Sequence, residues 1–321
     1  MSLDNACQIM EFFTGLQLSK SQTDSLLRQL ATDWDVQYDT IAELIALQMI
    51  VYIDETGWKF GRKSCYTRVF STTMHVLFRC GVSRRKEEAS AVLGDSFGGI
   101  GVTHDYAAYK NLFSQHQLCW AHLIRKAIKL ALMNPDEPEY AAFLDQLCSI
   151  YDDAKQLREN HRTNVTPDEQ REEVVQQLQT RVEALCTRHD EEVIKPDDSD
   201  RPSTSSHAET FILLQRELVG NLDRVFVFVE QPEVEPTNNR SERNVSREAE
   251  IRKGARTSKT DADAKRRSVI VTVLASLQTR IENFTLSRML AEIAGWLSTG
   301  SSIFEQELQT IQANLPPPAP A

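Results

Sequence analysis

Three short segments between residues 48 and 83 constrain the fold more than any other feature of the chain. They read "QMIVYIDETGW", "SCYTRVFSTT" and "MHVLFRCGVS", and each is rich in Val, Ile, Tyr and Phe. Tight connections separate them, so they predict an antiparallel meander of three strands. Next, "RKEEASAVLGDSF" predicts a helix that ends near Gly98, and "GIGVTHD" predicts a fourth strand.

Helical patterns surround these strands. Residues 3 to 49 predict three helices, two of which begin near a serine. "AAYKNLF" and "LCWAHLIRKAIKLALM" predict two more, and the charged stretch from 134 to 220 predicts further helices interrupted by the loop "KPDDSDRPSTSSHA". Late helices are predicted from "RSERNVSREAEIRK" and "DADAKRRSVIVTVLASLQTRIENF". This order is that of a ribonuclease-H-like domain, although other α/β arrangements share it.

The pattern divides the chain into parts of different character. We expect a helical lead-in over residues 1–47 and the first part of a ribonuclease-H-like core over 48–133. An acidic helical insertion with its loop follows over 134–230. The second part of the core, with the catalytic Glu helix and a basic segment, is expected over 231–300, and a tail over 301–321.

Composition excludes several classes of protein. The six cysteines are scattered without a Cys-x-x-Cys pair, which indicates reduced thiols in a cytoplasm. No run of about 18 apolar residues predicts a membrane span, and the first residues lack the order of a signal peptide.

The charge is unevenly distributed along the chain. The net charge is −10, yet residues 134–200 hold 18 Asp and Glu against 7 Lys and Arg, while residues 240–280 hold 11 Lys and Arg against 5 Asp and Glu. A phosphate backbone responds to charge within about 10 Å, so the basic segment is a candidate for binding DNA despite the acidic total. The alternative is a solvated helix face that pairs with the acidic segment.

Acidic residues fall where predicted strands and helices end or begin. Asp54 ends the first strand, Asp105 or the preceding His104 ends the fourth, and Glu242 lies near the start of a late helix. Carboxylates from separate elements suit hard Mg²⁺ ions, and two such ions about 3.5–4 Å apart activate an attacking oxygen and stabilise a leaving one. Taken singly, each residue has a simpler interpretation as a turn or helix cap.

Taken together, four blocks resemble the transposases of the insertion-sequence-66 family. They are "DETGW", "GG…VTHDYAAY", "QLCWAHLIRK" and "EPTNNRSERNVSREAEIRKGARTS", and the resemblance extends over residues 1 to 300. It implies a ribonuclease-H-like transposase domain of the DDE type, with a helical insertion before its last catalytic residue. It also implies that Asp54 and Glu242 are the first and third catalytic acids, holding two Mg²⁺ or Mn²⁺ ions. Cys119 and His122 match the family's Cys-Trp-Ala-His block, and we expect them to be structural, because Cys-x-x-His alone offers too few ligands for zinc.

The chain departs from the family pattern at the second acid. Alignment on Tyr106 and Tyr109 places His104, not Asp105, at the acidic position. A shift of one residue turns a side chain to the other face of a strand, although a strand end can twist enough for Asp105 to serve. A histidine prefers softer ions than Mg²⁺ and brings no negative charge. Both residues therefore stay candidates, and impaired catalysis is expected if His104 holds the position.

The resemblance implies DNA as partner, both transposon ends and target, with self-association on DNA. Basic residues around and after Glu242 are the candidates for phosphate contacts: Arg240, Arg243, Arg247, Arg252, Lys253, Arg256 and Lys259. Family members often carry an upstream region that recognises transposon ends, and we expect it to be missing from this chain. The alternatives are an inactive protein that binds DNA without cutting it and a nuclease that cuts without joining.

Overall fold

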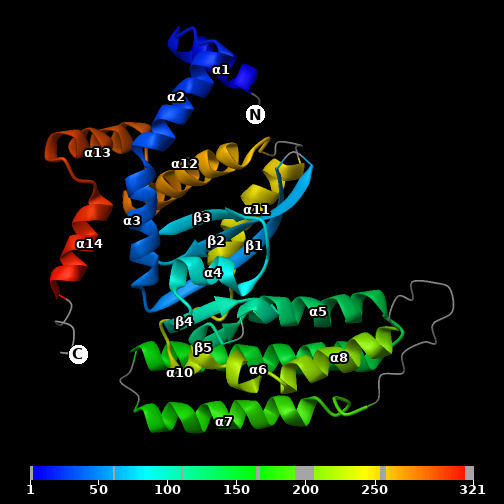
Figure 1. The fold of residues 1–321 in the computed structure, drawn as a ribbon. Helices are drawn as coiled ribbons and strands as arrows, with labels where there is room; N and C mark the ends of the chain where they lie inside the picture. Colours follow the sequence, from blue (N-terminus) through cyan, green and yellow to red (C-terminus); the bar gives the residue numbers. More distant parts are fainter. Residues whose placement is uncertain are drawn as a thin grey trace. The chain divides into compact units, whose positions relative to one another are not determined.

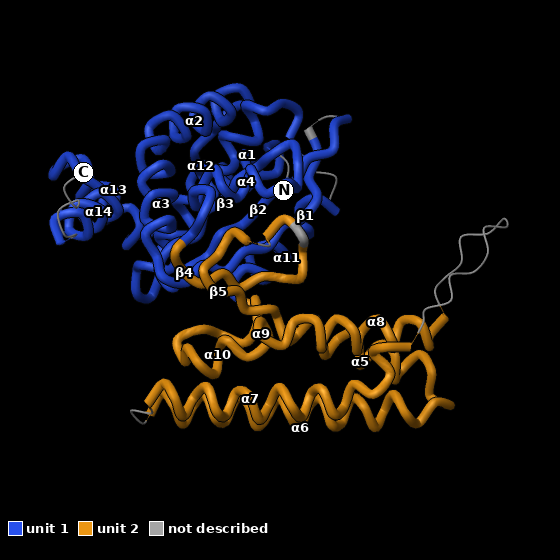
Figure 2. The backbone as a smooth tube through the Cα atoms, turned by 60° about the horizontal axis from the view of Figure 1, so that its bottom comes forward, with its two compact units in different colours: residues 1–97, 240–321 blue, residues 98–239 orange. Residues whose placement is uncertain are grey.

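The computed structural model describes residues 3–60, 62–109, 111–163, 167–191, 206–253 and 258–314. The chain divides into two compact units (Figure 2): unit 1 comprises residues 1–97 and 240–321, and unit 2 comprises residues 98–239. Both units contain strands and helices, so the predicted mixed α/β class is confirmed. Within the described parts of the chain, every helix is too short or too polar to cross a lipid bilayer.

Unit 1 contains the predicted meander (Figure 1). Its antiparallel strands are β1 (Ile50–Phe60), β2 (Lys63–Ser71) and β3 (Val76–Gly81). In the register, Val69 of β2 faces Asp54 of β1 on one side and Phe78 of β3 on the other. β-Branched and aromatic residues favour this pleated, half-buried surface. Val69 and Phe78 are buried, and Val245 and Val271 from later helices pack against them.

The outer edge of β3 is covered by helix α12 (Asp261–Arg280). The backbone N–H of Val76 donates to Ser276 Oγ at 3.0 Å, and the N–H of Phe78 donates to Thr272 Oγ1 at 2.9 Å. Ser276 Oγ in turn donates to the carbonyl of Val76 at 3.0 Å. Thr272 and Ser276 lie one helical turn apart, so they share a face of α12. These hydroxyls satisfy edge groups that would otherwise be open to pairing with another strand.

The other helices of unit 1 come from both ends of the chain. The predicted N-terminal helices are confirmed, and Ser19 begins the second with a capping box to Gln22. One helix, α14, lies in residues 301–321, the segment that the sequence analysis assigned to a tail. The helices are α1 (Leu3–Thr14), α2 (Lys20–Asp33), α3 (Asp35–Ala46), α4 (Lys86–Leu93), α11 (Asn239–Lys253), α13 (Leu286–Thr299) and α14 (Ile303–Asn314).

Unit 2 contains two strands, β4 (Phe97–Thr103) and β5 (Phe113–Leu118), which are neighbours in a sheet. They run parallel, because Ser114 Oγ donates to carbonyls at the start of β4 and the N–H of Cys119 donates to Thr103 at its end. The helix predicted from "AAYKNLF" was wrong: a single 3-10 turn, Ala107–Tyr109, precedes β5. The strand escaped detection because its sequence, "FSQHQL", is mostly polar.

The helices predicted between residues 134 and 220 are present in unit 2, whereas most of the predicted loop lies outside the described residues. Two of these helices pack through aromatic rings: Phe211 of the later one contacts Tyr140 and Phe143 of the earlier one, with ring centroids 4.7 and 5.0 Å away. The helices of unit 2 are α5 (Trp120–Met133), α6 (Pro138–Thr163), α7 (Asp168–Leu185), α8 (His207–Val219), α9 (Leu222–Val225) and α10 (Val227–Glu230).

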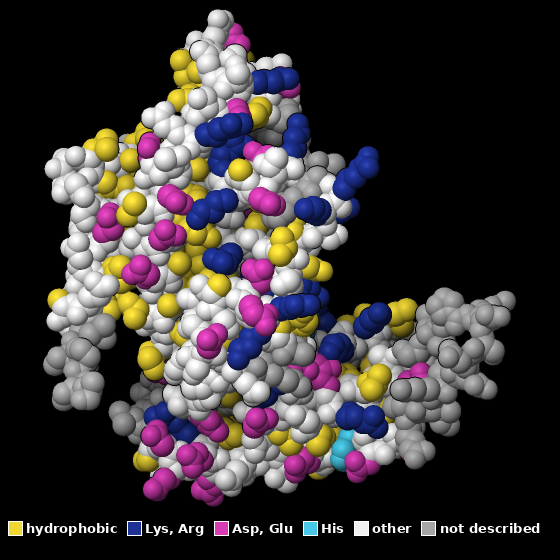
Figure 3. Space-filling view, in the orientation of Figure 1, with side chains coloured by type: hydrophobic (Ala, Val, Ile, Leu, Met, Phe, Trp, Pro, Cys, Tyr) yellow, Lys and Arg dark blue, Asp and Glu magenta, His cyan; other side chains and the backbone are white. Residues whose placement is uncertain are grey.

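The acidic character of this region appears on its surface. Figure 3 shows Asp and Glu side chains gathered over the first turns of α7. The exposed acidic residues there are Asp168, Glu169, Glu172 and Glu173. Acidic side chains in the first turn of a helix are stabilised by its dipole, so this surface is locally favourable even though it would repel DNA.

A half-buried ion pair joins two helices of unit 1, and its removal should be costly. Glu248 of α11 is 4% exposed, and its carboxylate accepts two hydrogen bonds from Arg267 of α12, at 2.5 and 3.2 Å. We expect Glu248→Ala to lower the free energy of unfolding by about 2 kcal/mol, because it leaves the half-buried Arg267 guanidinium without its carboxylate. Urea unfolding measures the change. Glu250→Ala, at an exposed position of the same helix, should change it by less than about 0.5 kcal/mol. Equal effects would contradict the assignment.

Candidate functional site

Asp54 lies in β1 of unit 1, beside a second carboxylate that has another role. Glu55 forms an ion pair with Arg84, and its side chain is only 6% exposed. Asp54 Oδ1 accepts a hydrogen bond from the backbone N–H of Glu55 at 2.8 Å. Of these two neighbouring carboxylates, Glu55 is therefore paired with an arginine, and Asp54 is the candidate for binding a metal.

Glu242 lies in the first turn of α11, and α11 begins against β1 in the same unit. The hydroxyl of Ser241 donates to the carbonyl of Tyr52 at 2.7 Å, and the Arg240 guanidinium lies 5.3 Å from the centroid of the Tyr52 ring. Tyr52 and Asp54 are two residues apart in a strand, so they share a face. The first turn of α11, which carries Glu242, is thus fixed beside the part of β1 that carries Asp54.

In unit 2, Asp105 follows β4 and its carboxylate is engaged by an arginine. Arg224 of α9 donates to Asp105 Oδ1 at 3.3 Å and also to Asn221 Oδ1 at 2.6 Å and His116 Nδ1 at 2.7 Å. Three acceptors surround one guanidinium whose side chain is 14% exposed. Asp105 thereby balances a half-buried positive charge, which is a structural role.

His116 continues this network to the backbone of His104. Arg224 only donates, so His116 Nδ1 accepts and its Nε2–H donates to Thr103 Oγ1, 2.7 Å away. The Thr103 hydroxyl then donates to the carbonyl of His104 at 2.6 Å. Burial, with the Arg224 charge beside it, lowers the pKa of His116 from 6.5 to about 3. The ring is therefore neutral, as the hydrogen-bond directions require.

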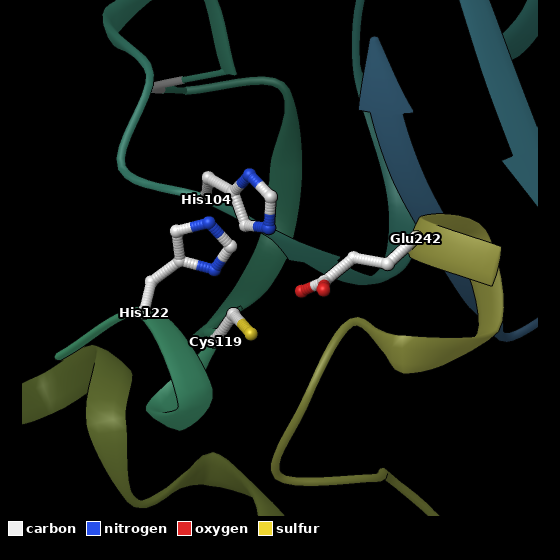
Figure 4. A group of neighbouring side chains, drawn as sticks. All are labelled: His104, Cys119, His122 and Glu242. Carbon is white, nitrogen blue, oxygen red and sulfur yellow. The ribbon is translucent and has the colours of Figure 1, made fainter. Parts of the chain in front are cut away.

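His104 itself lies with Cys119 and His122 of the same unit (Figure 4). One ligand atom from each of the three side chains lies within 4.8 Å of the others. The imidazole rings of His104 and His122 have centroids 3.5 Å apart and are inclined at 39°. The three residues line a small cavity of about 110 Å³, together with Asp105 and others. Figure 4 also draws Glu242.

Cys119 is held at the N-terminus of α5, where it is the N-cap residue and 2% exposed. The backbone N–H of Asn238 donates to its sulfur at 3.2 Å, and the N–H of Trp120 donates to the carbonyl of Pro236 at 3.0 Å. Hydrogen bonds therefore hold the segment that precedes α11 against the start of α5. This arrangement agrees with the structural role expected for Cys119 and places a nitrogen donor on its sulfur.

The residues of the two units fit different metals. Mg²⁺ takes oxygen ligands, which Asp54 and Glu242 of unit 1 supply. The group in unit 2 offers two imidazole nitrogens and a thiol sulfur, which are ligands of softer ions. His104 and its neighbours therefore do not fit Mg²⁺, whereas the carboxylates of unit 1 do.

The basic residues singled out from the sequence separate into two groups. Arg240 lies over Tyr52, and Arg252 Nη1 donates to the carbonyl of Gly57 at 2.7 Å, so both fasten α11 to β1 and its turn. Arg256 lies outside the described residues. Four are exposed: Arg243, Arg247, Lys253 and Lys259.

Sequence reasoning missed Arg224 and His116, which fix the surroundings of Asp105 and His104. Arg224 is 119 residues from Asp105 along the chain, and nothing in its own segment, "NLDRVF", marks it.

The neutral His116 should make the protein less stable in acid. Its pKa lies below the ordinary 6.5, so the unfolded chain takes up a proton between pH 6.5 and 3 that the folded chain does not. Relative to His116→Gln, the wild-type chain should lose about 2 kcal/mol of unfolding free energy between pH 7 and pH 5. Urea unfolding at the two pH values measures this difference. His207→Gln, at an exposed histidine, should show the same pH dependence as wild type. If His116→Gln loses as much unfolding free energy between pH 7 and pH 5 as wild type, His116 is not a buried neutral ring.

Comparison with known proteins identifies the family of the chain. A search of curated proteins gives no match. A family model described as "Transposase IS66 family" matches residues 1–266, which include Asp54, the three residues around the small cavity, and Glu242. A match over most of the chain shows the family, so this protein belongs to the IS66 family of transposases.

Proposed function

We propose that this chain is a DNA transposase that cleaves the phosphodiester at a transposon end and joins the freed 3′-hydroxyl to target DNA. The observation that carries the proposal is the family match over residues 1–266 together with the placement of Asp54 and Glu242 on adjoining elements of unit 1. Fold-level likeness alone does not assign chemistry, so the proposal rests on the acidic residues that the resemblance assigns to the family's catalytic positions.

The fold that we propose is ribonuclease-H-like. The chain order supports it: an antiparallel meander of β1, β2 and β3, then helix α4, then the parallel strands β4 and β5. The long helices α6, α7 and α8 come before α11, as expected of an insertion that precedes the last catalytic residue.

Asp54 and Glu242 would hold the divalent metal of such an enzyme, two ions of Mg²⁺ or Mn²⁺ in the family's chemistry. When bound, these ions supply an activated oxygen nucleophile and stabilise the leaving oxygen. The chain's own contribution is positional. Ser241 and Arg240 fix the first turn of α11 on Tyr52, so the Glu242 carboxylate is presented from a rigid element and not from a loop.

We propose that His104, not Asp105, stands at the second acidic position. The support is that Asp105 accepts from Arg224, while His104 lies beside Cys119 and His122. A neutral imidazole at this position removes one negative charge from the metal ligands. Strand transfer by the natural chain in Mg²⁺ is therefore weak, and it is absent if the protein is the DNA-binding remnant of an enzyme.

DNA is the proposed partner, and the exposed residues Arg243, Arg247, Lys253 and Lys259 are the proposed phosphate contacts. They belong to α11 and the segment after it, so they accompany the catalytic Glu242. Two transposon ends must be joined in one event, so we also propose that two copies of the chain act together on DNA.

Replacing His104 tests the catalytic proposal. With pre-cut transposon-end DNA and Mg²⁺, we expect His104→Asp to raise the rate of strand transfer by about 100-fold, the usual effect of one electrostatic group in an active site. Gel analysis of joined products measures the rate, with Glu242→Ala as the blank.

Asp105→Asn is the matched control at the neighbouring position. It should leave the low activity of the natural chain unchanged, because the Asp105 carboxylate serves Arg224. If Asp105→Asn abolishes joining that the natural chain performs, Asp105 is the metal ligand and the assignment to His104 is wrong. If His104→Asp binds the DNA but joins nothing, the proposed transposase chemistry of this chain fails.

The phosphate contacts are tested by the salt dependence of binding. Removing Arg243 and Arg247 together should weaken DNA binding and reduce the slope of log K against log salt by about 1.8, which is about 0.9 for each lost phosphate contact. Fluorescence anisotropy between 50 and 200 mM salt, as commonly used for such slopes, measures it. Arg162→Ala with Arg181→Ala removes two exposed arginines from the acidic helices α6 and α7. If the slope is unchanged without Arg243 and Arg247, or changes equally without Arg162 and Arg181, the proposed phosphate contacts on α11 are wrong.

A further inference from the structure

We propose that His104, Cys119 and His122 of unit 2 form a binding site for a soft divalent cation, with Zn²⁺ as the ion best suited to it. The two-residue pattern Cys-x-x-His is too small a ligand set for zinc, and the structure adds His104 from the end of β4 as a third ligand. The inference goes beyond the proposed transposase reaction, because it concerns metal binding by residues other than the family's acids.

The geometry allows three bonds to one ion. Zinc bonds of about 2.0–2.3 Å place tetrahedral ligand atoms about 3.5 Å apart, so atoms within 4.8 Å of one another close onto an ion after side-chain shifts of about 1 Å. The cavity of about 110 Å³ has room for the ion and a water in the fourth position.

Cys119 is held in place as a metal ligand would be. It is the N-cap residue of α5, so its side chain comes from the start of a long helix. The N–H of Asn238 already donates to its sulfur at 3.2 Å, which is the kind of outer hydrogen bond that holds a metal ligand in place. Asn238 is fully buried, so this donor is fixed.

The backbone of His104 is equally constrained. Its carbonyl accepts from Thr103, whose hydroxyl is the end of the chain of hydrogen bonds from Arg224 through His116. His104 therefore comes from an ordered strand end, and His122 comes from the first turn of α5. Ligands on rigid elements bind without ordering a loop.

The ligand types decide which ion is bound. Imidazole and thiolate select zinc and related transition metals, whereas Mg²⁺ requires oxygen. Where family members place a carboxylate for Mg²⁺, this chain has a ligand that completes a soft site with the Cys-x-x-His pair. The substitution at 104 thus changes the metal preference of this position as well as its charge.

Zn²⁺ titration of the full chain tests the site, with the protein kept reduced and first stripped by a chelator. We expect one Zn²⁺ per chain, not displaced by Mg²⁺ in large excess, and Co²⁺ used as a probe should show thiolate-to-metal charge-transfer absorption. Cys119→Ser, His122→Asn and His104→Ala should each weaken Zn²⁺ binding by at least about tenfold. Circular dichroism checks that each variant is folded.

Cys148→Ser and His189→Asn, in the same unit, are the matched controls and should bind Zn²⁺ as the natural chain does. The proposal is overturned if the folded natural chain binds no Zn²⁺, if Cys119→Ser binds it equally well, or if the Co²⁺ spectrum lacks the thiolate band. The readout contains no DNA, so failure of this site and failure of strand transfer are distinguishable.

Discussion

The guanidinium of Arg224 organises the polar part of unit 2 on which the candidate site depends. It occupies the Asp105 carboxylate, adds its charge to the burial that keeps His116 neutral, and through His116 and Thr103 reaches the carbonyl of His104. Withdrawing the Asp105 carboxylate would be costly, because the half-buried arginine would lose its charged partner. This contact is the reason that we propose His104, and not Asp105, for the second acidic position.

The two units offer different kinds of metal ligand. Unit 1 has the carboxylates of Asp54 and Glu242, on elements joined by the Ser241–Tyr52 hydrogen bond. Unit 2 offers nitrogen and sulfur. Metal preference follows ligand type, so the two sets favour different ions. On our proposal, this protein is a transposase in which loss of one function at position 104 is accompanied by gain of another.

Much of unit 1 could be predicted from the sequence, because the pattern of β1 to β3 and the capped helices around them are local signals. The strand β5 was missed because Ser114, Gln115, His116 and Gln117 make it polar. The partners of His116 and Gln117 lie on α9 and α10, far along the chain. The site was predicted in part. Asp54 and Glu242 follow from the family blocks and Cys119 and His122 from a short pattern, but the meeting of His104 with that pair is a tertiary contact that no spacing reveals.

The hydroxyls of Thr272 and Ser276 on the edge of β3 have a consequence for how the protein is made. Residues 98–239 of unit 2 are contiguous, whereas unit 1 needs residues from both sides of them. During synthesis the meander emerges early, and α12 emerges almost 200 residues after β3. Unit 2 can therefore bury its core while the edge of β3 is still uncovered. An open strand edge pairs readily with other chains. The nascent protein is therefore most prone to aggregation after β3 has been made and before α12 has been made. A chaperone that binds the nascent chain in that interval would benefit it more than one that acts after release.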